Sequence, residues 1–303
     1  MGGLDLAYRS LHVIGGRRDG GKAMIKVLAA FTLALMSSAA VADAPLERGK
    51  YLVDAVMACD GCHTPRPAGN FNMEKRFSGG SQVWDEHAYT VRGSNISSDR
   101  ETGIGAWSAD DLKRLLREGV RPSGIKVAPQ MPFVFYQILT PGDLDAVVTY
   151  IRSAAPVKNQ VPAPVYKAEM TYYPIPNAEK AFSEDMLTDP VKRGFYLATI
   201  AHCMECHSRR PDGTQDYKNW YGKGGAEFSG PFGKVNAANI SSHPTKGIGK
   251  MTDDELKRVL KEGVSRDGRK LAPPMARQVW FAKMTDQDIN AIVAWVRTIP
   301  PIE

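Results

Sequence analysis

Apolar side chains recur every three or four residues in two long segments, at residues 141–152 and 285–297. The recurring positions are Leu144, Val147, Val148 and Ile151 in the first segment and Ile289, Ile292, Val293 and Val296 in the second. This spacing places them on one face of a helix. Neither half of the chain shows a convincing alternation of apolar and polar residues, which is what a half-buried strand requires. The pattern therefore predicts an all-α fold.

Two further helices are predicted from the signals at their ends. In each, a Ser or Thr is followed three residues later by an acidic residue, which is the pattern of a capping box. A glycine, the usual residue at the end of a helix, follows the last apolar position. These residues are Ser108, Asp111 and Gly119 in one helix and Thr252, Glu255 and Gly263 in the other.

The chain repeats itself with an offset of 144 residues. Residues 95–131 and residues 239–275 are identical at 20 of 37 positions without a gap, and past residue 131 the offset becomes 145. A period this long exceeds the roughly 20–50 residues of solenoid repeats, so each copy is expected to be a whole domain. We therefore predict domains at residues 43–154 and 189–303, joined by a proline-rich connector at residues 155–188.

Residues 1–42 carry the pattern of a secretory signal peptide. Basic residues precede an uncharged apolar run, Val27–Val41, which ends in small residues ahead of Asp43. The run is shorter than the roughly 20 residues that a membrane-spanning helix needs. We expect cleavage near Asp43 and export to the periplasm, with an uncleaved anchor as the alternative and Met1 or Met24 as the start. After cleavage no integral membrane segment is expected, and peripheral membrane association stays open.

The net charge of +6 does not indicate a nucleic-acid partner. Residues 1–42 hold five of the 39 basic and two of the 33 acidic side chains, so 34 basic and 31 acidic side chains remain. Proteins that bind polyanions carry a much larger excess of positive charge.

All four cysteines of the chain lie in two C-x-x-C-H motifs, at residues 59–63 and 203–207. This motif is the attachment signature of c-type haem. Its two thiols form thioethers with the two vinyl groups, and the histidine that follows is directed at the iron. The sequence thus predicts two covalently bound haem c groups. The attachment residues are Cys59, Cys62, Cys203 and Cys206, and the first axial iron ligands are His63 and His207.

Two other uses of the cysteines have weaker support. A redox disulfide of the thioredoxin type would need a βαβ pattern around the motif, and none is recognisable. A structural zinc site usually takes four ligands from two clusters, whereas each predicted domain holds one cluster. Haem attachment is therefore the favoured interpretation.

The second axial ligand of each iron should recur with the repeat. Among the histidines and methionines outside the motifs, only Met131 and Met275 do so, each 72 residues after the first cysteine of its motif. Prolines next to both methionines hold the chain extended, which reduces the entropy lost when a thioether is fixed at a metal. We predict Met131 and Met275 as iron ligands, because His/Met ligation is a common arrangement that raises the potential of a haem.

Two other repeated features carry weaker signals. The triplets at residues 95–97 and 239–241 match the N-glycosylation pattern, which we take as incidental. Asn95 and Asn239 could either bond a haem propionate or form a plain polar turn. The basic stripes at residues 113–117 and 257–261 are expected to be solvated helix faces rather than docking sites.

With these motifs the chain resembles the cytochrome c subunits of periplasmic bacterial dehydrogenases, the group that serves alcohol, aldehyde and gluconate dehydrogenases. The resemblance rests on the C-x-x-C-H motifs, the Asn-Ile-Ser turn followed by Gly-Ile-Gly, the Glu-Gly-Val helix end and the two methionines. The best-known members carry three haems, whereas this chain has two motifs. The resemblance implies two tandem class I-like cytochrome c domains. It also implies a periplasmic dehydrogenase as electron donor, and another cytochrome or a terminal oxidase as acceptor.

The expected protein is an electron carrier without catalytic residues rather than an enzyme. The alternative is a dihaem redox enzyme such as a cytochrome c peroxidase, which needs one haem with an open coordination site. The two halves present the same ligand types at the same interval, and this symmetry counts against such a specialised pair.

Overall fold

The two segments with helical spacing are helices α4 (Pro141–Arg152) and α9 (Asp286–Val296). Each begins after a threonine, Thr140 or Thr285, whose hydroxyl accepts a hydrogen bond from the backbone N–H three residues on. Both predicted capping boxes also form, in α3 (Ala109–Glu118) and in α7 (Asp253–Glu262), and a left-handed glycine ends each of these helices. The local end signals in the sequence were therefore sufficient to predict these helices.

The computed structural model describes residues 44–303, which cluster into one compact unit. The predicted signal peptide at residues 1–42 lies outside the described residues. Within residues 44–303, no helix combines the length and the apolar character needed to span a membrane. Below, the first half means residues 44–154, the connector residues 155–188 and the second half residues 189–303.

Each half opens with a helix that leads to its cysteine motif. In the first half residues 44–51 are α-helical and continue into the π-helical segment η1 (Leu52–Met57). In the second half the corresponding helix is α5 (Pro190–Ile200). The remaining helices are short: α2 (Asp60–His63), α6 (Cys203–His207), α8 (Gln278–Phe281) and the 3-10 turns η2 (Pro67–Gly69), η3 (Met73–Lys75), η4 (Phe133–Phe135) and η5 (Glu184–Thr188).

The π-helical segment η1 accommodates one extra residue. The first cysteine of the motif comes eight residues after Tyr51 but only seven after the equivalent Tyr196. A π-helical turn holds more residues than an α-helical one, so it absorbs an insertion without moving the ends of the helix. In both halves a residue with positive φ, Ala58 (55°) or His202 (62°), stands directly before the cysteine.

The expectation of a purely helical fold is not confirmed, because short strands form in the described residues. β1 (Val83–Asp85), β2 (Tyr89–Arg92) and β3 (Val165–Tyr166) make an antiparallel sheet in that order. β4 (Glu227–Gly230) and β5 (Gly233–Asn236) form a hairpin. None of these strands exceeds four residues, so none is long enough for alternation to be recognised in the sequence.

The connector contributes to the first half. Its strand β3 pairs with β2, and the backbone N–H of Phe182 donates to the carbonyl of Ile138. The Tyr172 hydroxyl donates to the carbonyl of Val127 at 2.8 Å. The connector therefore packs in a defined way against the first half.

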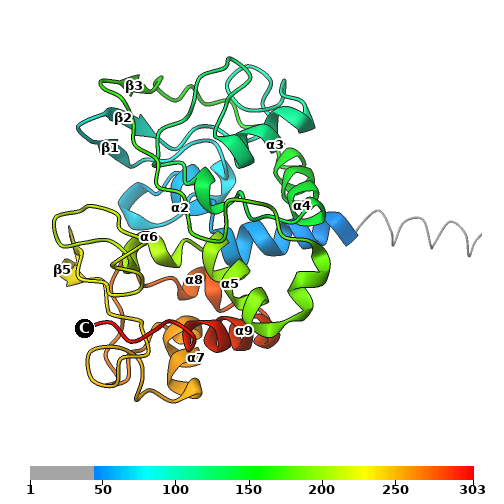
Figure 1. Ribbon diagram of the computed structural model, residues 1–303. Helices are drawn as coiled ribbons and strands as arrows, with labels where there is room; N and C mark the ends of the chain where they lie inside the picture. The colour runs from blue at the N-terminus through cyan, green and yellow to red at the C-terminus, as the bar shows by residue number, and fades with distance from the viewer. Residues whose placement is uncertain (1–43) are drawn as a thin grey trace, which may run out of the picture. The chain divides into compact units, whose positions relative to one another are not determined.

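The two halves share a hydrophobic core. In Figure 1, α5 lies against α9, and these two helices make the most extensive helix contact in the second half. One continuous cluster of buried side chains joins Leu52 and Leu144 of the first half to Leu197 and Ile289 of the second. A smaller cluster, which includes Trp295, belongs to the second half alone.

Candidate functional site

All four cysteines are half-buried. Cys59 stands directly before α2 and Cys62 lies within it, while Cys203 and Cys206 lie on α6. Burial raises the pKa of Cys62 and Cys203 to about 11 and that of Cys206 to about 12. Redox-active cysteine pairs instead have lowered thiol pKa values, because the thiolate is their reactive form. The environment of these thiols does not favour the thioredoxin-type interpretation.

The zinc interpretation also loses support. Within residues 44–303, no three or more His, Cys, Asp or Glu side chains gather in an arrangement that could hold a metal ion. A structural zinc site needs four such ligands in a tetrahedron. A haem iron asks less of the protein, because the porphyrin supplies four ligands and leaves only two axial positions.

The two motif histidines have the same hydrogen bond. His63 Nδ1 lies 2.8 Å from the carbonyl oxygen of Ser94, and His207 Nδ1 lies 2.7 Å from that of Ala238. A carbonyl can only accept, so Nδ1 carries the proton in both rings and Nε2 has a free lone pair. Burial lowers the pKa of both rings, which keeps them neutral. A neutral imidazole oriented through Nδ1 is the usual form of a metal-ligating histidine.

Glycines pack closely around the end of the first motif. A Cβ atom added to Gly93 would lie 1.7 Å from the carbonyl oxygen of Cys62, and one added to Gly80 would lie 2.0 Å from it. The backbone N–H of Gly79 donates to the carbonyl of His63, and Gly224 bonds His207 in the same way. These contacts fix the carbonyl end of each motif.

The predicted methionine ligands occupy corresponding loops. A short antiparallel bridge follows α3 at Val120–Lys126 and follows α7 at Val264–Lys270, and the methionine comes five residues later in each half. Met131 is half-buried and packs against the shared core, while Met275 is half-buried in its loop. Their pairing with His63 and His207 across the two irons stays a prediction.

Arg277 is a residue that the sequence analysis did not single out. It lies two residues after Met275, in the stretch where the repeat offset changes from 144 to 145. Its Nε atom is buried without a hydrogen-bond partner among the described residues. Burial raises the pKa of Cys203 and Cys206, and the positive charge of Arg277 acts in the opposite direction. Arg277 therefore lies near the second motif. A haem carboxylate would supply the missing acceptor, so the residues present fit the group.

The two repeated asparagines form polar turns. The side-chain oxygen of Asn95 accepts from the N–H of Ser97 at 2.9 Å, and its amide donates to the carbonyl of Val157 at 2.8 Å. Asn239 makes the same turn and donates to the carbonyl of Ile302. The amides therefore tie the chain beyond each C-terminal helix to the turn, which favours the plain-turn interpretation over a propionate contact.

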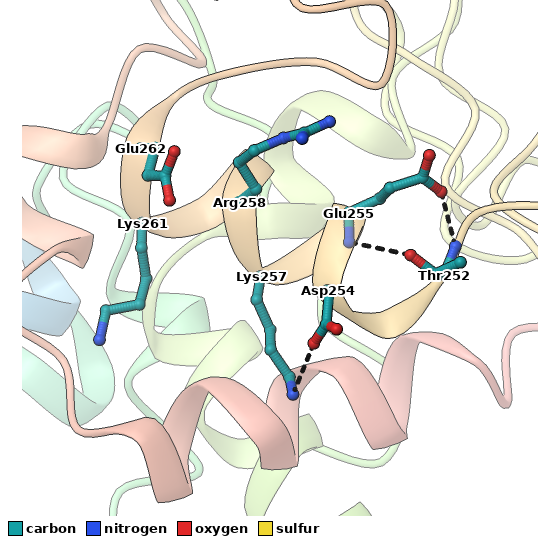
Figure 2. A pocket seen from close by; sticks show the side chains of 7 residues that line it. All are labelled: Thr252, Asp254, Glu255, Lys257, Arg258, Lys261 and Glu262. Carbon is teal, nitrogen blue, oxygen red and sulfur yellow. Dashed lines mark hydrogen bonds and ion pairs between the residues drawn. The ribbon is translucent and has the colours of Figure 1, made fainter.

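The basic stripes are largely neutralised by neighbouring acids and carbonyls. Figure 2 shows the hollow on α7, where Lys257 pairs with Asp254 at 3.4 Å. Lys261 pairs with Asp286, and Lys113 of the first stripe pairs with Asp145. These pairings agree with solvated helix faces. The hollow is lined by helix-surface side chains and includes no residue of either cysteine motif.

Aromatic side chains bring the two motifs toward each other, which the sequence pattern did not reveal. The segment after Met131 contacts the second motif, because the Tyr136 hydroxyl lies 2.7 Å from Nε2 of His202. The segment after Met275 contacts the first motif in return. A Cβ added to Gly61 would lie 3.7 Å from the Trp280 ring. Each half thus covers part of the other half's cysteine motif.

Comparison with known proteins identifies one domain directly. Residues 191–300 match the family described as cytochrome c. The chain is 30% identical to the fructose dehydrogenase cytochrome subunit of Gluconobacter japonicus over 84% of its own length and 52% of that protein. It is 28% identical to the gluconate 2-dehydrogenase cytochrome c subunit of Pantoea cypripedii, over 91% of this chain and 65% of the relative.

A shorter relative matches along most of its length. The diheme cytochrome c-type protein of Cereibacter sphaeroides is 27% identical over 81% of this chain and 83% of its own. The chain spans about half to two thirds of the two dehydrogenase subunits, at 52% and 65% of their lengths. The resemblance to dehydrogenase cytochrome subunits inferred from the motifs is confirmed by these relatives.

Proposed function

We propose that this chain, which contains a cytochrome c domain and resembles the cytochrome c subunits of bacterial dehydrogenases, is a periplasmic dihaem electron-transfer protein. Two haem c groups would be attached, one at Cys59 and Cys62 and one at Cys203 and Cys206. The electron donor would be a periplasmic dehydrogenase, and the acceptor another cytochrome or a terminal oxidase. The periplasmic location rests on the signal-peptide pattern in residues 1–42.

The observation that carries the proposal is the shared state of the two motif histidines. Both rings are neutral and bonded through Nδ1 to a carbonyl 31 residues further along the chain. This geometry leaves Nε2 of His63 and His207 available to an iron. Two equal sites favour two equal cofactors, in agreement with the diheme relative.

The residues of each site would have separate tasks. The cysteines would hold the cofactor covalently, and the histidine and methionine would both ligate the iron, so that no ligand position would be left for a substrate. Haem c supplies an iron that accepts and releases one electron. The protein would contribute the iron ligands, the exclusion of water and a fixed orientation of the group.

The ligand set can be tested by optical spectroscopy of the holoprotein. Produced with haem-attachment machinery, the wild-type chain should carry two haems and show the weak far-red band of methionine-bound ferric haem. Met131→Ala and Met275→Ala should each lose about half of this band. Met73→Ala is the control, because Met73 is 56% exposed and has no methionine at the equivalent position. Retention of the full band in either ligand variant would disprove that ligand.

The electron-carrier proposal and the peroxidase alternative predict different reactivity. A saturated carrier should reduce an acceptor cytochrome but should not turn over hydrogen peroxide. Peroxide turnover that is abolished by one axial-ligand variant, with the other haem intact, would favour the enzyme.

A further inference from the structure

Two tyrosine–aspartate hydrogen bonds cross between the halves in a reciprocal manner. Tyr51, on the first helix of the first half, donates to Asp288 in the first turn of α9. Tyr196, at the equivalent place in α5, donates to Asp143 in the first turn of α4 at 2.6 Å. Both tyrosines and both aspartates are related by the same offset of 145 residues. The contact is therefore self-complementary, like the interface of a twofold dimer.

Each aspartate is also held by an arginine of its own half. Arg48 forms a two-pronged bond to Asp143, with N–O distances of 2.7 and 2.8 Å. Arg193 donates to Asp288 at 2.5 Å. Bonds between an arginine and a carboxylate are strong and directional, so they fix the acceptor that the tyrosine of the other half must reach.

Burial makes the two crossing bonds sensitive to substitution. The Asp288 side chain is 1% exposed and the Asp143 side chain 9%. Burial raises the pKa of both Tyr51 and Tyr196, and the neighbouring carboxylates raise it further. Both hydroxyls consequently stay protonated and continue to donate. Without the hydroxyl, each buried carboxylate would lose one of its hydrogen bonds.

Other contacts that cross between the halves reach both cysteine motifs. Trp280 of the second half lies beside Gly61 of the first motif, and its ring centroid is 5.7 Å from that of Phe71. Tyr136 of the first half bonds His202, the residue directly before the second motif. The separation of the motifs thus depends on how the halves are held together.

We propose that Tyr51 and Tyr196 are positioning residues that hold the two haem sites in one fixed relation for electron transfer within the chain. This inference rests on the proposed dihaem function. The step moves one electron from a ferrous iron in one half to a ferric iron in the other, with no bond broken and no proton transferred. Tyr51 and Tyr196 act indirectly, because they hold the two halves together and do not contact the reacting atoms.

The test uses the haem-loaded protein with Tyr51→Phe, Tyr196→Phe and the double variant. One readout is the rate at which an electron equilibrates between the haems after rapid reduction of one of them. A second is denaturant unfolding, followed by hydrogen exchange that is read separately for peptides of the first half and of the second half. The matched control is Tyr150→Phe, because Tyr150 also donates to an aspartate, Asp54, but within one half.

We expect the double variant to slow equilibration at least tenfold and to separate the two unfolding curves. The control should leave the equilibration rate within a factor of two of wild type and keep the curves coincident. If the double variant does not fold with haem, the two single variants provide the same comparison with smaller effects. Wild-type rates and coincident curves in all tyrosine variants would overturn the inference.

The two proposals fail in different ways. A wild-type protein with fewer than two haems, or without methionine ligation, would contradict the proposed function. Two correctly ligated haems whose exchange ignores Tyr51 and Tyr196 would contradict only the positioning role.

Discussion

Gly194 approaches Ala291 so closely that a Cβ atom on the glycine would lie 1.9 Å from the alanine carbonyl oxygen. The contact joins α5 to α9 at a point where only hydrogen fits between the two backbones. The first half has the same arrangement, with 2.0 Å between a Cβ on Gly49 and the carbonyl oxygen of Ala146. Close packing of the first and last helices is therefore a feature of both halves.

Gly194→Ala should destabilise the protein by about 2 kcal/mol, the upper end of the overpacking cost after the helix preference of alanine is subtracted. Alanine favours a helix over glycine by about 1 kcal/mol, but overpacking of a tight contact costs about 1–3 kcal/mol, and here the obstacle is backbone that cannot rotate away. The free energy of unfolding, measured with denaturant on the holoprotein, checks this expectation.

Gly142→Ala is the matched control for this substitution. Gly142 also lies in a helix, α4, but its nearest neighbour is the flexible Glu184 carboxylate at 3.1 Å. We expect a change in stability within about 1 kcal/mol. Equal losses of stability from both substitutions would show that the close approach of α5 and α9 is not the cause of the loss.

Arg76 links three polar side chains beside the first cysteine motif. It pairs with Asp60 at 2.6 Å and with Asp54 at 2.5 Å, and donates to the Tyr150 hydroxyl at 2.7 Å. Arg76→Met should destabilise the first half by about 2 kcal/mol, because Asp60 would remain buried without its cation. The loss should stay below that of a fully buried pair, because the Arg76 side chain is 23% exposed.

The second half has an apolar counterpart of this cluster. Met204, Tyr221 and Trp295 stand at the positions of Asp60, Arg76 and Tyr150. Replacing a buried ionic group by well-packed apolar residues is often neutral. The triple variant Asp60→Met, Arg76→Tyr and Tyr150→Trp should therefore recover at least half of the stability lost by Arg76→Met, as measured by denaturant unfolding. A triple variant less stable than the single one would contradict this expectation.

Tyr136→Phe should destabilise the contact between the halves by about 1–3 kcal/mol. The substitution leaves Nε2 of His202 buried without its hydrogen-bond partner. Haem content should not change, because His202 is not a predicted ligand. Thermal unfolding together with the haem-to-protein ratio measures both effects, and an unchanged melting temperature would show that the bond adds nothing.

Local signals explain which elements the sequence could predict. Ser108 and Thr252 cap helices through bonds three residues away, so their pattern is visible in a short window. The strand β2 instead depends on β3, which lies more than 70 residues later, and the strands are too short to show alternation. Secondary structure that depends on distant pairing leaves little trace in local sequence.

The same distinction applies to the candidate site. Cys59 and His63 could be identified because the motif is contiguous, and the repeat pointed to the methionines. The carbonyl of Ser94 that orients His63 has no side-chain signature, so no residue pattern could indicate it. The bond from Tyr51 to Asp288 spans 237 residues. The available signal was that Tyr51 and Tyr196 are 145 residues apart, as are the two aspartates they bond. The cysteine motifs are 144 residues apart, so the tyrosines did not stand out as part of the same repeat.

The environment of Tyr51 predicts how the contact between the halves responds to alkali. Burial and, secondly, the bond to Asp288 raise the pKa of Tyr51 from 10.0 to about 12. Because the folded state holds this proton more tightly than the unfolded state, the stability that Tyr51 contributes is complete below about pH 10. It is lost as the pH rises through about 12. The ultraviolet absorbance of phenolate, as the difference between wild type and Tyr51→Phe, isolates this titration.

Asp288→Asn separates the two causes of the shift. Removing the carboxylate should lower the pKa of Tyr51 but leave it above 10.0, because burial is the larger cause. A Tyr51 that titrates near its ordinary value in the wild-type protein would mean that the hydroxyl is in water. The reciprocal bonds between the halves would then not form in solution, and the unfolding curves of the two halves should already be separate in the wild type.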